Sequence, residues 1–435
     1  MTGHAVLPRR AAVIVFLAFA FAYFLSALVR AVTATLAPTL AQEFSLQASD
    51  LGLLAGGYFL GFAATQLPLG TWLDRHGPRK VALGFLGVAV VGSLVFSVAT
   101  GFSGLLAGRV LCGAGVSACL MAPLTGYRRW FEPTAQMRAN SWMLMTGSLG
   151  MVASTLPVQW ALPLVGWRPL FWGLAALIAL SMVVIAVWVP GWAAGTPGAG
   201  GGGGGDGGDG GDATAERGPS GVTVPPGYAM VWRHPYFQRL APLGFFVYGG
   251  MVAMQTLWAG PWMQRVAGYS PLEAATGLFW INVAMLCTFW TWGMVNPWLL
   301  RKGLGADRLM AAGLPLCLVV LLGIILAGPQ AGGGAWALFC VSCTFVSLSQ
   351  PAVAMAFPQA LAGRALSAYN LVIFAGVFVV QWGIGLGVDA FAAAGLSTVQ
   401  SFQAAMAVYL ACNAVAYAWF LLQGRRHNVL QTTTP

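Results

Sequence analysis

Twelve long apolar runs, separated by short breaks of glycine, proline or charged residues, dominate this 435-residue chain. They lie near residues 12–38, 50–72, 81–101, 104–126, 139–162 and 168–190, and then near 239–262, 272–297, 307–328, 333–357, 364–388 and 402–423. A helix needs about 20 apolar residues to span a bilayer. Only 7% of the residues are charged, against about 25% in soluble proteins. The sequence therefore predicts an all-α integral membrane protein with twelve transmembrane helices, and it excludes a soluble enzyme.

The two sets of six runs are separated by residues 191–238, which contain the glycine-rich stretch GAGGGGGGDGGDGGD. Such a composition cannot bury a core and is typical of a flexible linker. We therefore expect an N-terminal six-helix bundle over residues 1–190 and a cytoplasmic linker over 191–238. A C-terminal six-helix bundle with a short cytoplasmic tail is expected over 239–435.

Basic residues are distributed unevenly among the predicted loops, and the formal net charge is +10. With the N-terminus inside, seventeen of the 21 basic residues lie in cytoplasmic loops or at the two ends; the others are Arg30, Arg109, Arg168 and Arg265. This asymmetry follows the positive-inside rule. It predicts a plasma-membrane protein (the inner membrane of a bacterium) with both termini in the cytoplasm and no nucleic-acid partner. Because no small-residue cleavage site follows the first run, that span is expected to be retained.

The two halves also share a local pattern, since Arg138-Ala-Asn-Ser141 opens the fifth run and Arg364-Ala-Leu-Ser367 opens the eleventh. Internal repetition of this kind is typical of transporters built from duplicated bundles, with a binding site between them. We therefore expect the two bundles to be pseudo-symmetric.

The loop after the second run reads Gly70-Thr-Trp-Leu-Asp74-Arg75-His-Gly77-Pro-Arg79-Lys80. It resembles the signature loop of the major facilitator superfamily, G-x-x-x-D-R-x-G-R-[RK], except that Pro78 precedes the Arg-Lys pair. In the fourth run, Arg109-Val-Leu-Cys-Gly113-Ala-Gly115 is similar to the family's R-x-x-x-G-x-G segment. The six-linker-six layout extends the resemblance over the whole chain, which implies a secondary transporter.

The resemblance also implies a gate. In the family, the equivalent of Asp74 docks against the start of the eleventh span, here near Arg364, where a helix dipole favours a carboxylate. Arg75, Arg79 and Lys80 are expected to meet anionic lipid headgroups. The predicted gating residues are Gly70, Asp74, Arg75, Gly77, Arg79, Lys80, Arg109, Gly113 and Arg364.

A charge inside a span usually faces a cavity, and Arg30 lies in the outer half of the first run. In the organic-anion branches of the family, an Arg at about this place binds the substrate's carboxylate or phosphate. A snorkelling or packing role for Arg30 is the alternative. Further substrate-binding candidates, each of which could equally join helices, are Gln255, Trp258, Asn282, Gln350, Asn370 and Gln381. The segment from Trp258 to Trp262, with Pro261 inside it, is expected to break the seventh helix.

No acidic residue lies at a span centre, so a positive cavity suits an anion better than a cation. The sequence thus favours secondary active or facilitative transport of a small organic anion by alternating access. Efflux of apolar or cationic compounds stays open as an alternative, as does a sensor that does not transport. A soft-metal transporter is a further alternative, from Met251 with Met254 and Cys340 with Cys343.

No catalytic constellation or nucleotide-binding loop is found, so we expect no enzyme activity, no cofactor and no metal site. The expected partners are a small-molecule substrate and the lipid bilayer, and the expected state is a monomer.

Overall fold

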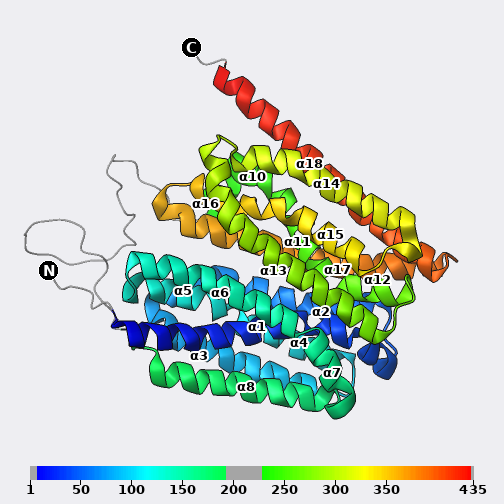
Figure 1. Cartoon of the computed structure of the whole chain (residues 1–435), viewed down its shortest axis with the longest axis horizontal. Helices are drawn as coiled ribbons and strands as arrows, with labels where there is room; N and C mark the ends of the chain where they lie inside the picture. Colours follow the sequence, from blue (N-terminus) through cyan, green and yellow to red (C-terminus); the bar gives the residue numbers. More distant parts are fainter. Residues whose placement is uncertain (1–6, 193–227, 433–435) are drawn as a thin grey trace, which may run out of the picture.

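The computed structural model describes residues 7–192 and 228–432, and every regular element within these ranges is helical. This confirms the all-α class. The glycine tract of the predicted linker lies outside the described residues, and the bundle boundaries at 190 and 239 stay predictions. Both described chain ends lie at the same end of the molecule (Figure 1), which we call the termini end. The opposite end, with the turns near residues 45–47, 265–270 and 394–397, is the loop end.

The first half contains α1 (Arg9–Phe44), α2 (Ala48–Ala64), α3 (Gln66–Val98), α4 (Phe102–Val116), α5 (Ala118–Trp130), α6 (Pro133–Ala153), α7 (Leu156–Val165) and α8 (Trp167–Trp188). The second half contains α9 (Tyr228–Arg233), α10 (Pro235–Pro242), α11 (Gly249–Ala253), α12 (Ala259–Arg265), α13 (Pro271–Arg301), α14 (Ala306–Ala327), α15 (Gly333–Cys343), α16 (Ser349–Met355), α17 (Gln359–Ala393) and α18 (Thr398–Thr432). Short π segments, η1 (Leu243–Tyr248) and η2 (Met254–Trp258), and 3-10 segments, η3 (Gly328–Gln330) and η4 (Thr344–Leu348), complete the second half.

Ten or eleven candidate spans correspond to the twelve that the sequence predicts. Ten are long and apolar enough to cross a membrane, and α6 with α7, bent by 43°, forms an eleventh. The second expected span is divided, because α2 continues into the first turns of α3 through Thr65, whose backbone is close to helical. The chain then turns at Gly77, where φ is +77°, and the rest of α3 is the third span. Thus α3 combines the end of one span with the whole of the next.

The seventh span is widened rather than broken near Pro261. It runs through α10, η1, α11, η2 and α12, and the π segment η2 ends directly before α12. A proline cannot donate the helical hydrogen bond, and its ring clashes with the carbonyl four residues earlier, here within η2. A π bulge relieves that clash while keeping the helix continuous.

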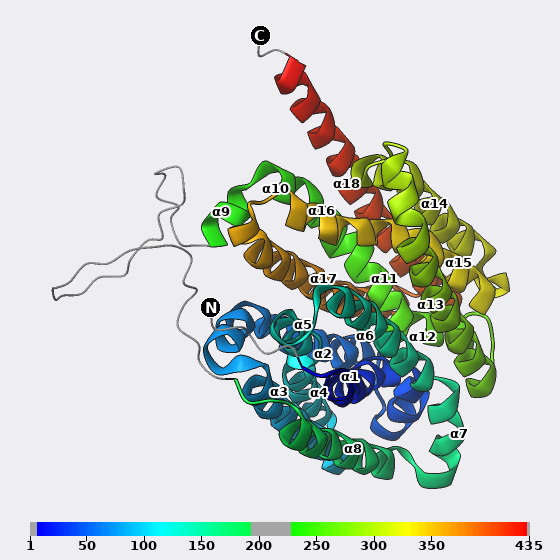
Figure 2. The ribbon, with the colours of Figure 1, turned by 60° about the vertical axis from the view of Figure 1, so that its left-hand side comes forward.

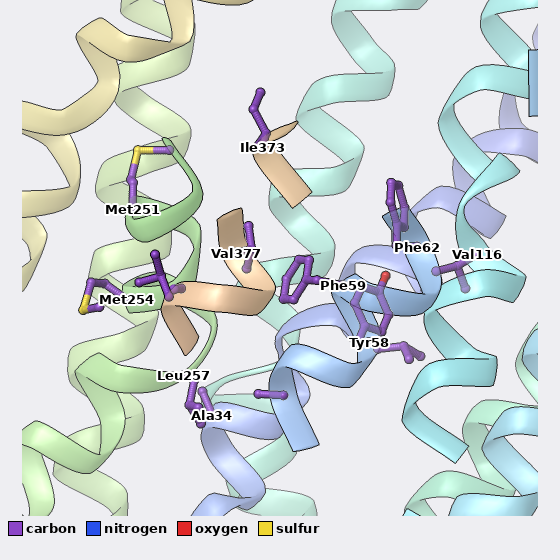
Figure 3. Packing of buried hydrophobic residues seen from close by; sticks show 14 of the residues in the cluster. Ala34, Tyr58, Phe59, Phe62, Val116, Met251, Met254, Leu257, Ile373 and Val377 are labelled. Carbon is purple, nitrogen blue, oxygen red and sulfur yellow. The ribbon is translucent and has the colours of Figure 1, made fainter. Parts of the chain in front are cut away.

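The two halves meet along α2 and α17, which pack side by side in the middle of the molecule (Figure 2). Glycines on two faces of α2 permit this placement. A Cβ at Gly61 would lie 2.1 Å from the carbonyl oxygen of Val110 in α4, and one at Gly52 would lie 2.4 Å from that of Gln381 in α17. Apolar side chains fill the contact further along, where Phe59 faces Val377 (Figure 3). Helix α2 is therefore packed backbone to backbone against both halves.

Polar contacts fasten the helix ends within each half. At the loop end, Arg168 pairs with Glu43 at 2.6 Å, and the Trp167 indole donates to the same carboxylate. At the termini end, Arg239 pairs with Asp307 at 2.6 Å. Both pairs are partly exposed, so each contributes at most about 1 kcal/mol. Their role is to fix the ends of neighbouring helices.

Gly61→Ala should destabilise the protein, because the added methyl group meets the Val110 carbonyl oxygen and overpacking costs about 1–3 kcal/mol. Gly84→Ala is the matched control, since a Cβ there meets nothing within 4 Å and alanine is the better helix former. Thermal unfolding of the purified variants in detergent tests the difference. Equal melting temperatures for the two variants would contradict close α2–α4 packing.

Candidate functional site

A cavity of about 960 Å³ lies between the two halves. Its walls come from α1 and α6 on one side and from the seventh span, α13 and α16 on the other. The lining reaches Ser141, near the start of α6, and Met294, near the end of α13, so the cavity extends toward the termini end. At the loop end the halves touch, because a Cβ at Gly260 of α12 would lie 3.3 Å from the Ala34 carbonyl oxygen of α1.

Arg30 is the one charged side chain among the described residues that line this cavity. Its guanidinium lies beside the hydroxyl groups of Tyr23 and Tyr58 and 5.9 Å from the ring centre of Phe62. Its Nε is buried and has no hydrogen-bond partner within the described chain. A buried cation with a spare donor attracts an anionic group strongly, since little water competes for it.

The backbone that carries Arg30 is held by Arg109 of α4. Arg109 is fully buried; its Nη1 donates to the Val29 carbonyl at 2.8 Å and its Nη2 to the Arg30 carbonyl at 3.4 Å. Its guanidinium also lies 4.9 Å from the ring centre of Tyr58. Gly113, one turn further on, has no Cβ to keep α4 from the Tyr58 carbonyl of α2. These two predicted gating residues thus position α1 and α2 near the cavity.

Two of the six neutral candidates line the cavity with Arg30, namely Gln255 and Gln350. Each is oriented by a candidate behind it. Gln255 Nε2 donates to Asn282 Oδ1 at 2.9 Å, and Gln350 Nε2 donates to Asn370 Oδ1 at 2.7 Å. Both amide pairs therefore present fixed polar groups to the cavity from the second half.

The other two candidates, Trp258 and Gln381, are buried outside the cavity lining. The Trp258 indole donates to the Gln381 carbonyl at 3.1 Å, and Gln381 Nε2 donates to Thr256 Oγ1 at 2.9 Å. These bonds join the seventh span to α17. In this conformation the pair is positioned to hold helices together rather than to touch a solute.

Two cavity tyrosines were not among the sequence candidates. Tyr23 lies seven residues before Arg30, which is two helical turns and therefore the same face of α1. Tyr248 lines the opposite wall and its hydroxyl donates to Gln350 Oε1 at 3.3 Å. Helical spacing from Arg30 was a signal for Tyr23, whereas nothing in the local sequence marks Tyr248.

The signature loop is fastened near the end of α8. Gly77 has a positive φ, and the Trp192 indole packs directly over it, where a Cβ would not fit. Arg79 donates to the Ala186 carbonyl near the end of α8, so its expected contact with lipid headgroups is replaced by capping of a helix C-terminus.

The remaining charged residues of the predicted gate form no ion pairs with one another among the described residues. Arg75, Lys80 and Arg364 are exposed. Asp74 is also exposed, and it makes no hydrogen bond or ion pair with any other residue that the structure describes. A Cβ at Gly70 would meet nothing within 4 Å. The predicted contact between Asp74 and the start of α17 is therefore not formed among the described residues in this conformation.

Within residues 7–192 and 228–432, no group of three or more His, Cys, Asp or Glu side chains is arranged to hold a metal ion. Met251 lines the cavity, but Met254, Cys340 and Cys343 are buried away from its lining. The soft-metal alternative therefore gains no ligand set from the described residues.

A family model described as Major Facilitator Superfamily matches residues 19–381. The chain belongs to this superfamily. It is accordingly an integral membrane protein of a family whose members are secondary transporters and not enzymes. The expected fold is also confirmed by a solved structure, a bacterial homolog to the human lysosomal transporter Spinster in an inward-facing and unoccupied conformation. That structure has a TM-score of 0.75 at 18% identity and covers 96% of this chain and 98% of its own.

Curated relatives of this superfamily member match only part of it. The inner membrane transport protein YajR of Escherichia coli is 29% identical over 32% of this chain and 30% of its own length. The 4-hydroxybenzoate transporter PcaK of Pseudomonas putida is 28% identical over 38% of this chain and 37% of its own. Others are named as multidrug and nitrate/nitrite transporters. The chain thus matches about a third of the length of these relatives, or less.

Cys287 offers a native test of the cavity of this transporter, since it is exposed on the lining. Five other cysteines are buried, namely Cys112, Cys119, Cys317, Cys340 and Cys343. A water-soluble maleimide should therefore modify Cys287 quickly in folded protein and leave those five intact, because thiol reactivity requires access. Peptide mass spectrometry measures the site of modification. Cys412→Ser, at a half-exposed position outside the lining, is the control and should not change the rate at Cys287.

Proposed function

We propose that this chain carries a small organic anion by alternating access, by secondary active or facilitative transport, with Arg30 as the group that binds the anion. The observation that supports this most directly is the isolation of Arg30. It is the one charge among the described lining residues, and its Nε has no partner there. A guanidinium is always ionised and binds a carboxylate through two parallel hydrogen bonds.

The rest of the lining favours an anion with one charge and an apolar body. The described lining carries no carboxylate and no second cation, while Trp142, Phe289 and Met151 supply apolar surface. A second negative charge would therefore be desolvated without a partner. The name of PcaK, a 4-hydroxybenzoate transporter, supports a substrate of this kind. Gln255 and Gln350, oriented by Asn282 and Asn370, are the groups that hydrogen-bond its polar substituents.

The proposal places the termini end in the cytoplasm, as the distribution of basic residues indicates. The name of YajR as an inner membrane protein supports the bacterial inner membrane. With that orientation, the cavity extends toward the cytoplasmic side. The halves before residue 191 and after residue 238 move against each other as a monomer, and Asp74 docks at the start of α17 when the cytoplasmic side closes.

Efflux of apolar or cationic compounds is the second candidate function. A relative named as a multidrug transporter favours it, as does the apolar part of the lining. Arg30 opposes a cationic substrate, since like charges repel in a site of low dielectric.

Replacement of Arg30 separates the two functions. Arg30→Lys keeps the charge but loses the planar pair of donors, so affinity for a monocarboxylate should fall about ten- to a hundredfold. Ligand-induced thermal shift and liposome uptake with benzoate and 4-hydroxybenzoate measure this. Methyl 4-hydroxybenzoate, which has no charge, is the matched control ligand. Normal carboxylate uptake by Arg30→Lys would leave efflux of apolar compounds as the better interpretation.

Replacement of Asp74 tests the proposed cytoplasmic gate. Asp74→Asn removes a charge whose contact with a helix N-terminus is worth about 0.3–1 kcal/mol, or up to ~2 when partly buried. The ratio of the two open states should then change by up to about thirtyfold. Turnover in liposomes should slow while affinity in a fixed conformation stays close to wild type. Glu132→Gln, another exposed acidic residue at the termini end, should not slow turnover.

A further inference from the structure

A carboxylate from one half caps a helix of the other half at the loop end. Asp389 lies in the last two turns of α17 and is half-buried. Its two oxygens accept hydrogen bonds from the backbone N–H groups of Ala48, at 3.2 Å, and Ser49, at 2.7 Å. These are the first two residues of α2. The contact therefore links residues 340 positions apart in the chain, across the interface between the halves.

The α2 terminus depends on Asp389 because its own capping groups are already engaged. Gln47 and Asp50 form a capping box, in which the Asp50 carboxylate accepts from the Gln47 N–H at 3.0 Å and the Gln47 side chain accepts from the Asp50 N–H. Each orphan N–H at a helix start needs an acceptor. Within the described residues, Asp389 is the side chain that serves the two N–H groups between these positions.

Next to the cap, α2 and α17 pack against each other through one residue per helical turn on each helix. On α17 these residues are Gln381, Gly385 and Asp389, and on α2 they are Ala48 and Gly52. A Cβ at Gly385 would lie 2.4 Å from the Ala48 carbonyl oxygen, and one at Gly52 would lie 2.4 Å from the Gln381 carbonyl oxygen. The cap and the backbone contact therefore form or separate together.

We propose that Asp389 is the residue that holds the loop end closed during transport. When the halves separate at that end, the carboxylate leaves the α2 terminus and its two N–H groups pass to water. The arrangement is the counterpart of the one expected for Asp74. There, a carboxylate near the end of the second span is expected to cap the start of α17; here, a carboxylate near the end of α17 caps the start of α2. The assignment does not depend on the identity of the solute or on the role of Arg30.

A cap that only stabilises the fold would have a different effect from a latch. Loss of a simple cap raises solvent exchange only at the first turn of α2. Loss of a latch also loosens contacts at the loop end that Asp389 does not touch, such as the contact between Gly260 of α12 and Ala34 of α1. The distant segment is therefore the informative one.

Hydrogen–deuterium exchange of the full-length protein, followed by mass spectrometry, tests the proposal without a substrate. In Asp389→Asn, amide exchange should rise about two- to thirtyfold in residues 48–53 and also in 258–268. Exchange at the termini end, in 359–366, should fall. Asp50→Asn is the matched control, since it removes a carboxylate from the same helix end without touching the other half. It should raise exchange only near residues 47–50.

A second pair of variants avoids the carboxylate. Gly385→Ala should reproduce the Asp389→Asn pattern, because its methyl group pushes α17 away from the Ala48 carbonyl. Gly383→Ala, whose Cβ meets nothing within 4 Å, should match wild type. Unchanged exchange in 258–268 for both Asp389→Asn and Gly385→Ala would overturn the proposal. So would failure of Asp389→Asn to fold, because the contact would then be needed in every state.

Discussion

Lipid offers apolar helices no hydrophobic reason to associate, so close backbone contact must supply much of the attraction between them. In this protein that contact is concentrated on α2, where Gly61 faces α4 and Gly52 faces α17. The two glycines lie on different faces of one helix. Consequently α2 packs closely against the first half through α4 and against the second half through α17. The cavity, the caps and the separation of the halves all depend on this double contact.

Much of the architecture could be predicted from the sequence, because spans and topology are local properties. The apolar runs predicted twelve spans, and Arg30 was singled out as a charge within one of them. The division of the second span at Thr65 and the π segment before Pro261 could not be predicted in detail, since they depend on how neighbouring helices satisfy the backbone. The signature loop predicted basic residues at the lipid surface, but the Arg79 guanidinium donates to the Ala186 carbonyl near the end of α8.

The sequence could suggest polar residues for the site, but it could not tell which of them line the cavity and which support a lining residue. Gln255 and Gln350 line it, whereas Asn282 and Asn370 stand behind them as hydrogen-bond partners. Composition cannot separate these roles, because an amide that binds a ligand and one that orients another amide are chemically the same. Trp258 was a candidate for its indole, and that indole is engaged by the Gln381 carbonyl. Asp389 carried no signal, because the backbone N–H groups that donate to its carboxylate lie in a helix more than 300 residues away.

Weak polar contacts between the halves suit a transporter better than strong ones. A ligand or gate must supply about 5.5 kcal/mol to reverse a two-state population from 1:99 to 99:1, so a state held by several buried ion pairs would rarely be left. The two ion pairs found in residues 7–192 and 228–432, Glu43–Arg168 and Asp307–Arg239, each lie within one half. Between the halves, the half-buried Asp389 contacts a helix terminus, an interaction worth about 0.3–1 kcal/mol, or up to ~2 when partly buried. Asp74 is proposed to make the equivalent contact at the termini end. Closing one end would then form one cap while opening the other end breaks a cap of similar strength. The two end states would then stay close in free energy, and the anion that we propose binds at Arg30 would bias the balance between them.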